Sequence, residues 1–297
     1  MKQVLTGFFI VLLVGGCGSN DEKPGASPPP STNGEISKSL STVECNNCVT
    51  FGNRASPKKA LVIGNSKYDH KPLENPQNDA TDMANLLAEE MGFHVIRAVN
   101  LSSKEMKKVI GDFHQLVAKT PANVDDKVGL FYFSGHGARS NRDENYLLPT
   151  DNGKIRTDYD LRRQAFQVKS DIVVPLETDN NGANIIIADA CRDNPYEDSD
   201  KSNKRGLKPI SPSPAQQQKG GALIAFAASE GQLSDDGPGR NGLYTEHLLA
   251  KMRELKNAPI ERIFKRVTDP VKKKSNGNQT PEYASSLTKK YCLKECQ

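Results

Sequence analysis

Short runs of branched apolar residues alternate with amphipathic stretches from residue 58 to the end of the chain. Runs of roughly four to eight apolar residues between turn signals predict buried strands, because helices need longer periodic segments. Five such strands are predicted: "KALVIGN" (59–65), "FHVIRAV" (93–99), "KVGLFYFSG" (127–135), "NIIIADA" (184–190) and "GGALIAFAAS" (220–229). A short final strand is predicted in "PEYASSL" (281–287).

Helical periodicity fills most of the intervals between these strands. Helices are predicted over residues 75–91, 102–120, 241–255 and 259–274. The second begins with a capping box formed by Ser102 and Glu105, a pair that satisfies the first free N–H groups of a helix. Strands that alternate with helices, and that are apolar on both faces, are typical of parallel sheets with helices on either side. We therefore predict an α/β fold, a three-layer sandwich around a mostly parallel central sheet.

The amino-terminal residues are typical of an export signal rather than of the folded body. Lys2 precedes the apolar run "VLTGFFIVLLV", which is too short to span a membrane comfortably. The run ends in "VGGC", which resembles the lipobox of bacterial lipoproteins and would make Cys17 the lipidated residue. An ordinary signal peptide with a chance cysteine is the alternative. We predict an exported protein, anchored by lipid to the cell envelope, with a slight preference for the outer membrane facing the periplasm, because Gly18 is not the Asp associated with inner-membrane retention.

Charge and composition exclude one class of partner. The chain has 40 basic and 36 acidic residues, a net charge of +4, and 36% hydrophobic residues. Such a balanced charge, without a basic patch that contains aromatic residues, argues against nucleic-acid binding. The densest basic run, Lys272 to Lys274, is interpreted as a solvated helix end.

The six cysteines divide into two pairs and two single residues. Cys45 and Cys48 precede the predicted strands, and Cys292 and Cys296 follow them. In an oxidising compartment these four are disulfide candidates of undetermined connectivity, including bridges that tie the two ends together. A closed four-thiolate zinc site is the alternative, and it would favour a structural envelope protein. No metal site is predicted, and Cys191 is left over as a single thiol.

Two reactive side chains come at the ends of predicted strands. His136 follows the third strand in "FSGHG", and Cys191 follows the fourth in "DAC". The carboxyl ends of parallel strands meet at one edge of a sheet, so these residues meet if the strands are neighbours. An imidazole is suited to taking the proton of a thiol near neutral pH, which predicts a Cys/His dyad. Gly135 and Gly137 are expected to allow a tight turn and to leave room for a substrate chain. Singly, each residue could instead be an inert buried group.

Five blocks in this order resemble the bacterial caspase-like, or metacaspase-type, cysteine peptidases (peptidase C14). They are "KALVIGNSKY", "LENPQNDATDM", "LFYFSGHG", "DACRDNP" and "NGLYTEHLL". His136 lies 55 residues before Cys191, similar to the spacing in caspases. The resemblance implies the caspase-hemoglobinase fold, Cys191 as nucleophile, His136 as general acid and base, and the amides of Gly137 and Cys191 around the oxyanion.

The resemblance also implies a specificity that differs from that of animal caspases. Asp189 stands where those enzymes have Gln, and in similar metacaspases a second acid lines the same pocket, here Asp79. A carboxylate near the first subsite pairs with a cation and repels an acid. Protein or peptide substrates with Arg or Lys at P1 are therefore expected. Asp79 as a helix-start acid and Asp189 as a strand-end acid are the simpler readings.

The polar insert after Cys191 has two interpretations. Caspase-like enzymes often carry a cleavable linker, and this one offers basic residues for self-cleavage, namely Lys204, Arg205, Lys208 and Lys219. The alternative is a disordered surface loop. Asp235 or Asp236, in a loop that resembles one bordering the substrate cleft, could touch substrate or serve only in a turn. No cofactor is predicted; calcium activation is compatible with the resemblance, but no calcium-binding spacing is present.

The predicted organisation follows from these segments. It consists of a lipoprotein signal peptide (1–16), a flexible tether with the CxxC pair (17–57), a caspase-like peptidase domain (58–291) with a linker insert at about 196–220, and a cysteine-containing tail (292–297). A catalytically silent caspase-fold scaffold or binding module at the cell envelope is the alternative function. The presence of both His136 and Cys191 argues against it, because degenerate members usually lose one of the two.

Overall fold

The computed structural model describes residues 45–121, 123, 126–191, 207–212, 219–235, 237 and 239–296, and of Cys191 only the backbone. Within these residues the strands form one sheet of nine. The strands are β1 (Cys48–Phe51), β2 (Lys58–Gly64), β3 (His94–Val99), β4 (Val128–Arg139), β5 (Asn145–Leu147), β6 (Phe166–Gln167), β7 (Ala183–Cys191), β8 (Ala222–Phe226) and β9 (Glu282–Ser285). The α-helices are α1 (Pro76–Asn85), α2 (Ser103–Lys119), α3 (Asp158–Gln164), α4 (Val174–Asp179), α5 (Leu243–Glu254) and α6 (Ile260–Lys274).

The main path of the sheet has the order β1-β3-β2-β4-β7-β8-β9. The five central strands run parallel to their neighbours, and only β1 and β9, at the two edges, run antiparallel. The short strands β5 and β6 continue from the end of β4 as a small antiparallel extension. The predicted α/β fold with a mostly parallel sheet is confirmed.

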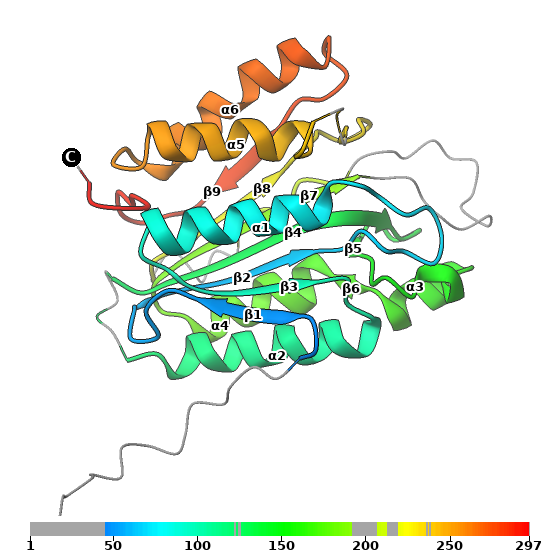
Figure 1. Ribbon diagram of the computed structural model, residues 1–297, viewed down its shortest axis with the longest axis horizontal. Helices are drawn as coiled ribbons and strands as arrows, with labels where there is room; N and C mark the ends of the chain where they lie inside the picture. The colour runs from blue at the N-terminus through cyan, green and yellow to red at the C-terminus, as the bar shows by residue number, and fades with distance from the viewer. Residues whose placement is uncertain are drawn as a thin grey trace, which may run out of the picture. The chain divides into compact units, whose positions relative to one another are not determined.

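Helices cover both faces of this sheet (Figure 1). Side chains along a strand alternate between faces, so each central strand contributes to two cores. On β2, Ala60 and Val62 pack with α1, α5 and α6, whereas Leu61 and Ile63 pack with α2 and α4. The continuous apolar runs in the sequence follow from this burial on both sides.

Local sequence signals account for the starts of two helices. The capping box predicted for α2 is present, because the Ser102 side chain accepts from the Glu105 N–H and Glu105 accepts from the Ser102 N–H. Helix α1 has Pro76 in its first turn, where the missing N–H has no helical partner anyway. Its α-helical part is shorter than predicted, since a π-helical turn (Leu86–Glu90) carries the chain on to the next strand.

Residues assigned to the flexible tether instead belong to the sheet. Cys48–Phe51 form β1, which pairs antiparallel with β3. Phe51 packs against the core, and the Arg97 guanidinium lies 5.7 Å from the centre of its ring. This short strand escaped notice because it has only four residues, too few for a periodic pattern.

The carboxyl-terminal tail also packs on the body, contrary to the predicted boundary at residue 292. Cys292 and Leu293 are buried, and the Lys58 ammonium donates to the Leu293 carbonyl at 2.8 Å. The disulfides are local: Cys45 bonds to Cys48, and Cys292 bonds to Cys296. Neither bridge ties the two ends of the chain together, and the four sulfurs are not gathered as a zinc site requires.

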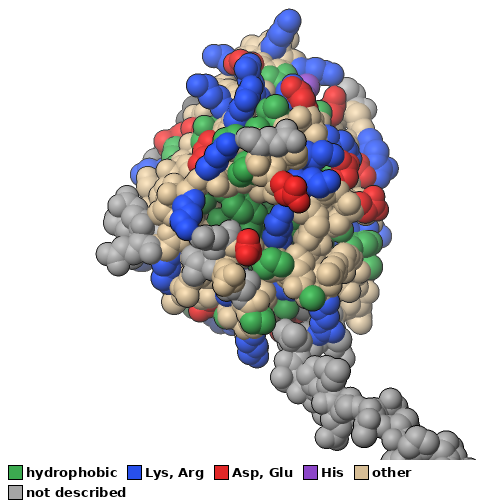
Figure 2. Space-filling view, turned by 90° about the vertical axis from the view of Figure 1, so that its left-hand side faces the viewer, with side chains coloured by type: hydrophobic (Ala, Val, Ile, Leu, Met, Phe, Trp, Pro, Cys, Tyr) green, Lys and Arg blue, Asp and Glu red, His purple; other side chains and the backbone are tan. Residues whose placement is uncertain are grey.

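Figure 2 shows the face at the amino-terminal ends of the parallel strands, with Lys and Arg gathered toward its top, where α6 lies in Figure 1. Lys272, Lys273 and Lys274 are exposed in the last turn of α6, as a solvated helix end would be. None of the helices in the described part of the chain is both long and apolar enough to span a bilayer. Among the same residues, no group of three or more His, Cys, Asp or Glu side chains is arranged to hold a metal ion.

Candidate active site

His136 and Cys191 are partners in the parallel ladder between β4 and β7. The sequence argument required these two strands to be neighbours, and they are. Paired positions on parallel strands lie at the same level and on the same face of a sheet. The backbone therefore brings the candidate base and the candidate nucleophile to one rim, at the end of β7.

The imidazole of His136 is buried and held on two sides. Its ring centre lies 4.4 Å from that of Tyr68, with the planes tilted by 49°. Its Nε2 atom lies 2.6 Å from the carbonyl oxygen of Lys71. A carbonyl oxygen only accepts, so Nε2 is the donor, and in the neutral ring Nδ1 is then the basic nitrogen.

The glycines on either side of His136 have a different role from the one predicted. A Cβ atom at Gly135, where φ is +153°, would lie 2.3 Å from the Tyr68 hydroxyl. A Cβ atom at Gly137 would lie 3.1 Å from the Cβ of Ala190 and 3.4 Å from Cδ2 of Leu207. The space beside both glycines is occupied by the protein itself, so neither leaves room for a substrate chain on that side.

Asp79 joins helix α1 to strand β4 and to the start of α5. Its carboxylate accepts from the Ser134 hydroxyl at 2.9 Å and from the backbone N–H of Gly242 at 3.0 Å. The side chain is almost completely buried, with 1% of its residue surface exposed. An acid in the first turn of a helix usually faces solvent, whereas this one faces the sheet.

Asp189, two residues before Cys191 on β7, is buried beside α5. It accepts from the Ser234 hydroxyl at 2.8 Å and from the Thr245 hydroxyl at 2.6 Å. The Thr245 hydroxyl in turn lies 2.5 Å from the hydroxyl of Tyr132. Because Thr245 donates its one proton to the carboxylate, Tyr132 is the donor in this second bond.

The two carboxylates share one buried site in which no cation is described. Burial, and next the charge of Asp189, raise the pKa of Asp79 from 3.8 to about 7. Burial also raises the pKa of Asp189, against the lowering effect of its hydrogen bonds to Thr245 and Ser234. Two acids held this way favour either a shared proton or an added positive charge.

Helix α1 also holds the loop that covers this acid pair. The side-chain amide of Asn78 donates to the carbonyl of Arg240 at 3.0 Å. The Arg240 guanidinium makes a two-pronged ion pair with Asp82, with N–O distances of 2.9 and 3.0 Å. Asn78, Asp79 and Asp82 lie on one face of the helix, so a single surface of α1 fixes residues 239–242 over the site.

A buried glutamine, Gln279, supports the loop whose Ser234 donates to Asp189. It was not identified from the sequence. Gln279 is 1% exposed. Its amide nitrogen donates to the carbonyl of Ala227 at 2.9 Å and to the Ser234 hydroxyl at 3.2 Å, and its oxygen accepts from the Asp235 N–H at 3.0 Å. Its partners come from a loop more than 40 residues away, so no local signal marks it. Asp235 thus contributes its backbone here, and Asp236 lies outside the described residues.

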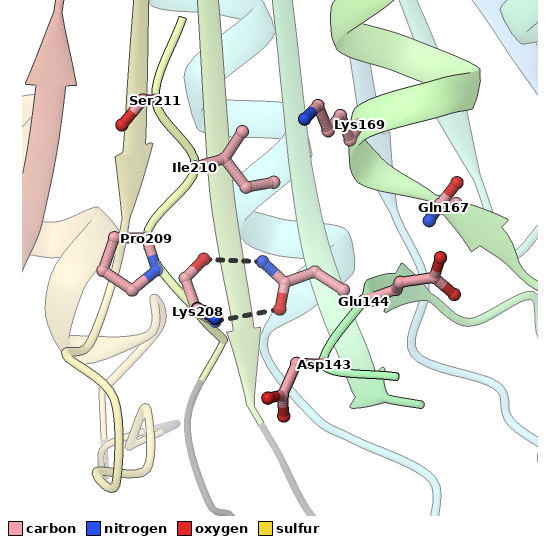
Figure 3. Close-up of a pocket in the computed structure, with 9 residues that line it drawn as sticks. Asp143, Glu144, Gln167, Lys169, Lys208, Pro209, Ile210 and Ser211 are labelled. Atoms are coloured by element: carbon pink, nitrogen blue, oxygen red, sulfur yellow. Dashed lines mark hydrogen bonds between the residues drawn. The ribbon is translucent and has the colours of Figure 1, made fainter. Parts of the chain in front are cut away.

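Part of the predicted insert packs against β5 beside the site. The side-chain amide of Asn145 donates to the Lys208 carbonyl at 2.7 Å and accepts from the Lys208 N–H at 2.9 Å, as a neighbouring strand would (Figure 3). Leu207 is buried. A pocket of about 360 Å³ lies between this segment and the β4–β5 turn, and is lined by Asp143, Glu144, Asn145, Gln167, Lys169, Lys208, Pro209, Ile210 and Ser211. Neither His136 nor the acid pair lines it.

Comparison with known proteins agrees with this geometry. The caspase domain family model matches residues 57–292. Human mucosa-associated lymphoid tissue lymphoma translocation protein 1 is 26% identical over 247 residues, which cover 80% of this chain and 27% of that protein. The mouse homologue matches with the same identity and coverage. The chain therefore spans only about a quarter of the length of these relatives.

Two solved structures show the same fold. Protein GSU0716 from Geobacter sulfurreducens superposes with a TM-score of 0.57 and 17% identity, over 81% of this chain and 100% of that one. Caspase-1 from Spodoptera frugiperda gives a TM-score of 0.57 and 17% identity, over 81% of this chain and 92% of that one. The family resemblance read from the five sequence blocks is confirmed: the chain belongs to the caspase domain family of cysteine peptidases.

Proposed function

We propose that this protein is a cysteine endopeptidase that hydrolyses peptide bonds after Arg or Lys. The observation that carries the proposal is the pairing of His136 with Cys191 across two neighbouring parallel strands. A thiol and an imidazole are together sufficient for nucleophilic attack on a peptide carbonyl. Asp79 and Asp189 supply negative charge close by.

The chemistry follows from the two groups. Nδ1 of His136 takes the proton of the Cys191 thiol, and the thiolate attacks the scissile carbonyl carbon. The oxyanion accepts hydrogen bonds from the amides of Gly137 and Cys191. The imidazolium then protonates the departing amine, which leaves a thioester. Water, deprotonated by His136, attacks this thioester and releases the carboxylate product and the free thiol.

Selectivity for a basic P1 residue rests on the acid pair. A guanidinium or ammonium group is attracted to the two neighbouring carboxylates, while an acidic side chain is repelled. The site is covered by residues 239–242 in this structure. Entry of a long basic side chain therefore requires a small outward shift of this loop.

Self-cleavage within the insert is part of the proposal. Lys208 is held by Asn145, and the Lys219 ammonium donates to the carbonyls of Glu177 and Thr178. We therefore favour cleavage after Lys204 or Arg205, which lie outside the described residues. Mass spectrometry of the purified protein tests this: fragments that end at Lys204 or Arg205 should be present in the wild type and absent from Cys191→Ala.

Export and lipid anchoring are proposed from the sequence alone, because Cys17 and the signal segment lie outside the described residues. Replacement of Cys17 by Ser should move the protein from the membrane fraction to the periplasmic fraction. A Cys17→Ser protein that still fractionates with membranes, in the way of the wild type, would contradict the anchor. The catalytic proposal does not depend on this result.

A peptide panel that varies only P1 tests the catalytic proposal. Wild-type protein should hydrolyse the Arg and Lys peptides, and hydrolysis should be at least about a hundredfold slower for Asp or Gln at P1, as loss of a buried charge pair implies. Cys191→Ala should show no turnover. Equal turnover by wild type and Cys191→Ala would exclude the mechanism, and a preference for Asp would exclude the role of the acid pair.

A further inference from the structure

Two groups that contact the His136 imidazole come from one loop. The connection between β2 and α1 contains Tyr68, whose ring lies beside the imidazole, and Lys71, whose carbonyl faces Nε2. Lys71 has a positive φ of 56°, which turns the chain sharply at this point. The contact from Lys71 is made to one ring nitrogen, and the Tyr68 ring lies against the imidazole as a second restraint.

The Tyr68 hydroxyl forms part of a closed set of hydrogen bonds around the backbone of His136. It accepts from the His136 N–H at 2.8 Å and donates to the Leu148 carbonyl at 3.3 Å. The Leu148 N–H donates back to the His136 carbonyl at 2.9 Å. His136 is thus held at its N–H, at its carbonyl and along its ring face, and Tyr68 provides two of these three contacts.

The Tyr68 hydroxyl also explains why the residue before His136 is a glycine. A side chain at Gly135 would meet the Tyr68 hydroxyl at 2.3 Å. Tyr68 itself is 5% exposed and belongs to a small core cluster with Tyr146 and Leu148. Tyr68 is therefore packed in the interior of the protein, against the last part of β4.

We propose that Tyr68 is a positioning residue for catalysis: its ring and hydroxyl hold His136 so that Nδ1 stays available to the thiol of Cys191. This inference rests on the proposed peptidase function. Tyr68 itself takes no part in bond making or breaking. Its loss lowers the fraction of molecules in which the dyad is correctly arranged, which reduces kcat and leaves KM nearly unchanged.

Tyr68→Phe tests the hydroxyl, because it keeps the ring contact and removes the acceptor of the His136 N–H. Tyr146→Phe is the matched control: Tyr146 is 4% exposed in the same cluster, and its hydroxyl donates to Glu144 instead. We expect Tyr68→Phe to lower kcat about tenfold, the effect of leaving one buried N–H unpaired beside the base. Tyr146→Phe should change kcat less than about twofold, as a substitution away from the site does.

Alkylation of Cys191 gives a readout that needs no substrate. The other four described cysteines are in disulfides, so iodoacetamide consumption by the Cys17→Ser protein reports on Cys191. The alkylation rate, measured from pH 5 to 9, should fall near neutral pH in Tyr68→Phe and not in Tyr146→Phe, because only the first loosens the base that assists thiolate formation. Incorporation of 4-aminophenylalanine at position 68, which restores a donor and acceptor, should recover the rate.

The outcomes separate this inference from the proposed function. If wild-type protein hydrolyses no peptide and its thiol reacts like an ordinary one, the peptidase proposal fails. If wild type is active but Tyr68→Phe and Tyr146→Phe behave alike in both assays, Tyr68 is only a core residue and the inference is overturned. Should Tyr68→Phe fail to fold, the 4-aminophenylalanine protein decides: full kcat and alkylation rate support positioning by the hydroxyl, whereas a folded but impaired protein contradicts it.

Discussion

Asp79 on helix α1 and Asp189 on strand β7 face the same point from different elements. A Cβ atom at Gly242 would lie 3.3 Å from Oδ2 of Asp79 and 3.5 Å from Oδ2 of Asp189. The residues are 110 positions apart in the chain, and the neighbourhood of β4 and β7 brings them together. Their shared burial makes three properties of the protein testable: its selectivity, its response to pH and its dependence on the supporting residues.

Replacement of Asp189 by Asn should abolish the preference for basic P1 residues. Asparagine has the same shape as aspartate and keeps part of the hydrogen bonding to Ser234 and Thr245. It lacks the charge that attracts a guanidinium. Removing one partner of a buried ion pair costs roughly 3 kcal/mol, which corresponds to about a hundredfold lower kcat/KM for Arg peptides. Peptides with an uncharged P1 residue should be affected much less. Asp112→Asn is the control, since Asp112 pairs with Lys108 on helix α2, away from the acid pair, and should leave the P1 ratio unchanged.

The substrate-free protein should lose stability as the pH rises toward 7. Burial, and then Asp189, raise the pKa of Asp79 from 3.8 to about 7, so the folded state binds a proton that the unfolded chain releases. This contribution is fully present below about pH 4 and is lost as the pH rises through about 7. Chemical denaturation should show the free energy of unfolding of wild type falling by about 2–4 kcal/mol more than that of Asp79→Asn between pH 4 and 8.

The control for this pH effect is on the same helix. Arg240 lowers the pKa of Asp82 through hydrogen bonds and charge, against the effect of burial. The free energy of unfolding of Asp82→Asn should therefore fall between pH 4 and 8 by the same amount as that of the wild type. If the free energy of unfolding of Asp79→Asn fell with pH as steeply as that of the wild type, Asp79 and Asp189 would not be coupled in a closed site.

Gln279 should be essential for the loop that carries Ser234. Gln279→Ala removes the partner of the Ala227 carbonyl, whose hydrogen bond is buried, and the partner of the less buried Asp235 N–H, at a cost of roughly 2–4 kcal/mol in unfolding free energy. Gln232→Ala provides the comparison, because that half-buried side chain also bridges to residues 277–280 but should cost less than about 1 kcal/mol. Urea midpoints measure both. Equal midpoints for the two variants would show that burial of Gln279 does not matter.

Among the contacts between α1 and the sheet, the one at Gly64 should be the most sensitive to substitution. A Cβ atom at Gly64 would lie 2.1 Å from the Pro76 carbonyl oxygen and 2.7 Å from the Ala80 side chain, so Gly64→Ala pushes α1, with Asp79, away from β4. We expect a loss of about 3 kcal/mol or more in unfolding free energy and a lower kcat/KM for Arg peptides. Gly111→Ala, in helix α2 with no atom within 4 Å of the new Cβ, should instead gain about 0.5–1 kcal/mol. Similar thermal midpoints for both variants would contradict the close packing of α1.

Many features of the catalytic region could be predicted from short segments of the sequence. The apolar runs of β2, β3, β4, β7 and β8 have no polar alternation, which marks strands buried on both faces. His136 and Cys191 follow two of these runs directly, so their place could be predicted from the chain alone, except that β4 continues past His136 to Arg139 whereas β7 ends at Cys191. The cap at Ser102 and the family resemblance were predictable for the same reason, since each depends on residues close together in the sequence.

Weak local signals account for what was missed. Cys48–Phe51 and the segment after Tyr291 join the body through backbone bonds and a few side chains, and neither has a periodic apolar pattern. The glycines beside His136 suggested an open channel, because a sequence does not show which atoms occupy the space next to a missing side chain. Tyr68 fills that space beside Gly135.

The sequence by itself determined most of the longer strands and helices, and which apolar runs are followed by reactive side chains, because those properties arise from neighbouring residues. The tertiary structure alone decided that β4 lies beside β7 in the register that pairs His136 with Cys191. It alone also decided that Asp79 and Asp189 each accept a hydrogen bond from the first residues of α5 or its cap, and that Tyr68 and Gln279 hold the site. These contacts join residues 45 to 163 positions apart, and such pairings depend on the packing of the whole sheet.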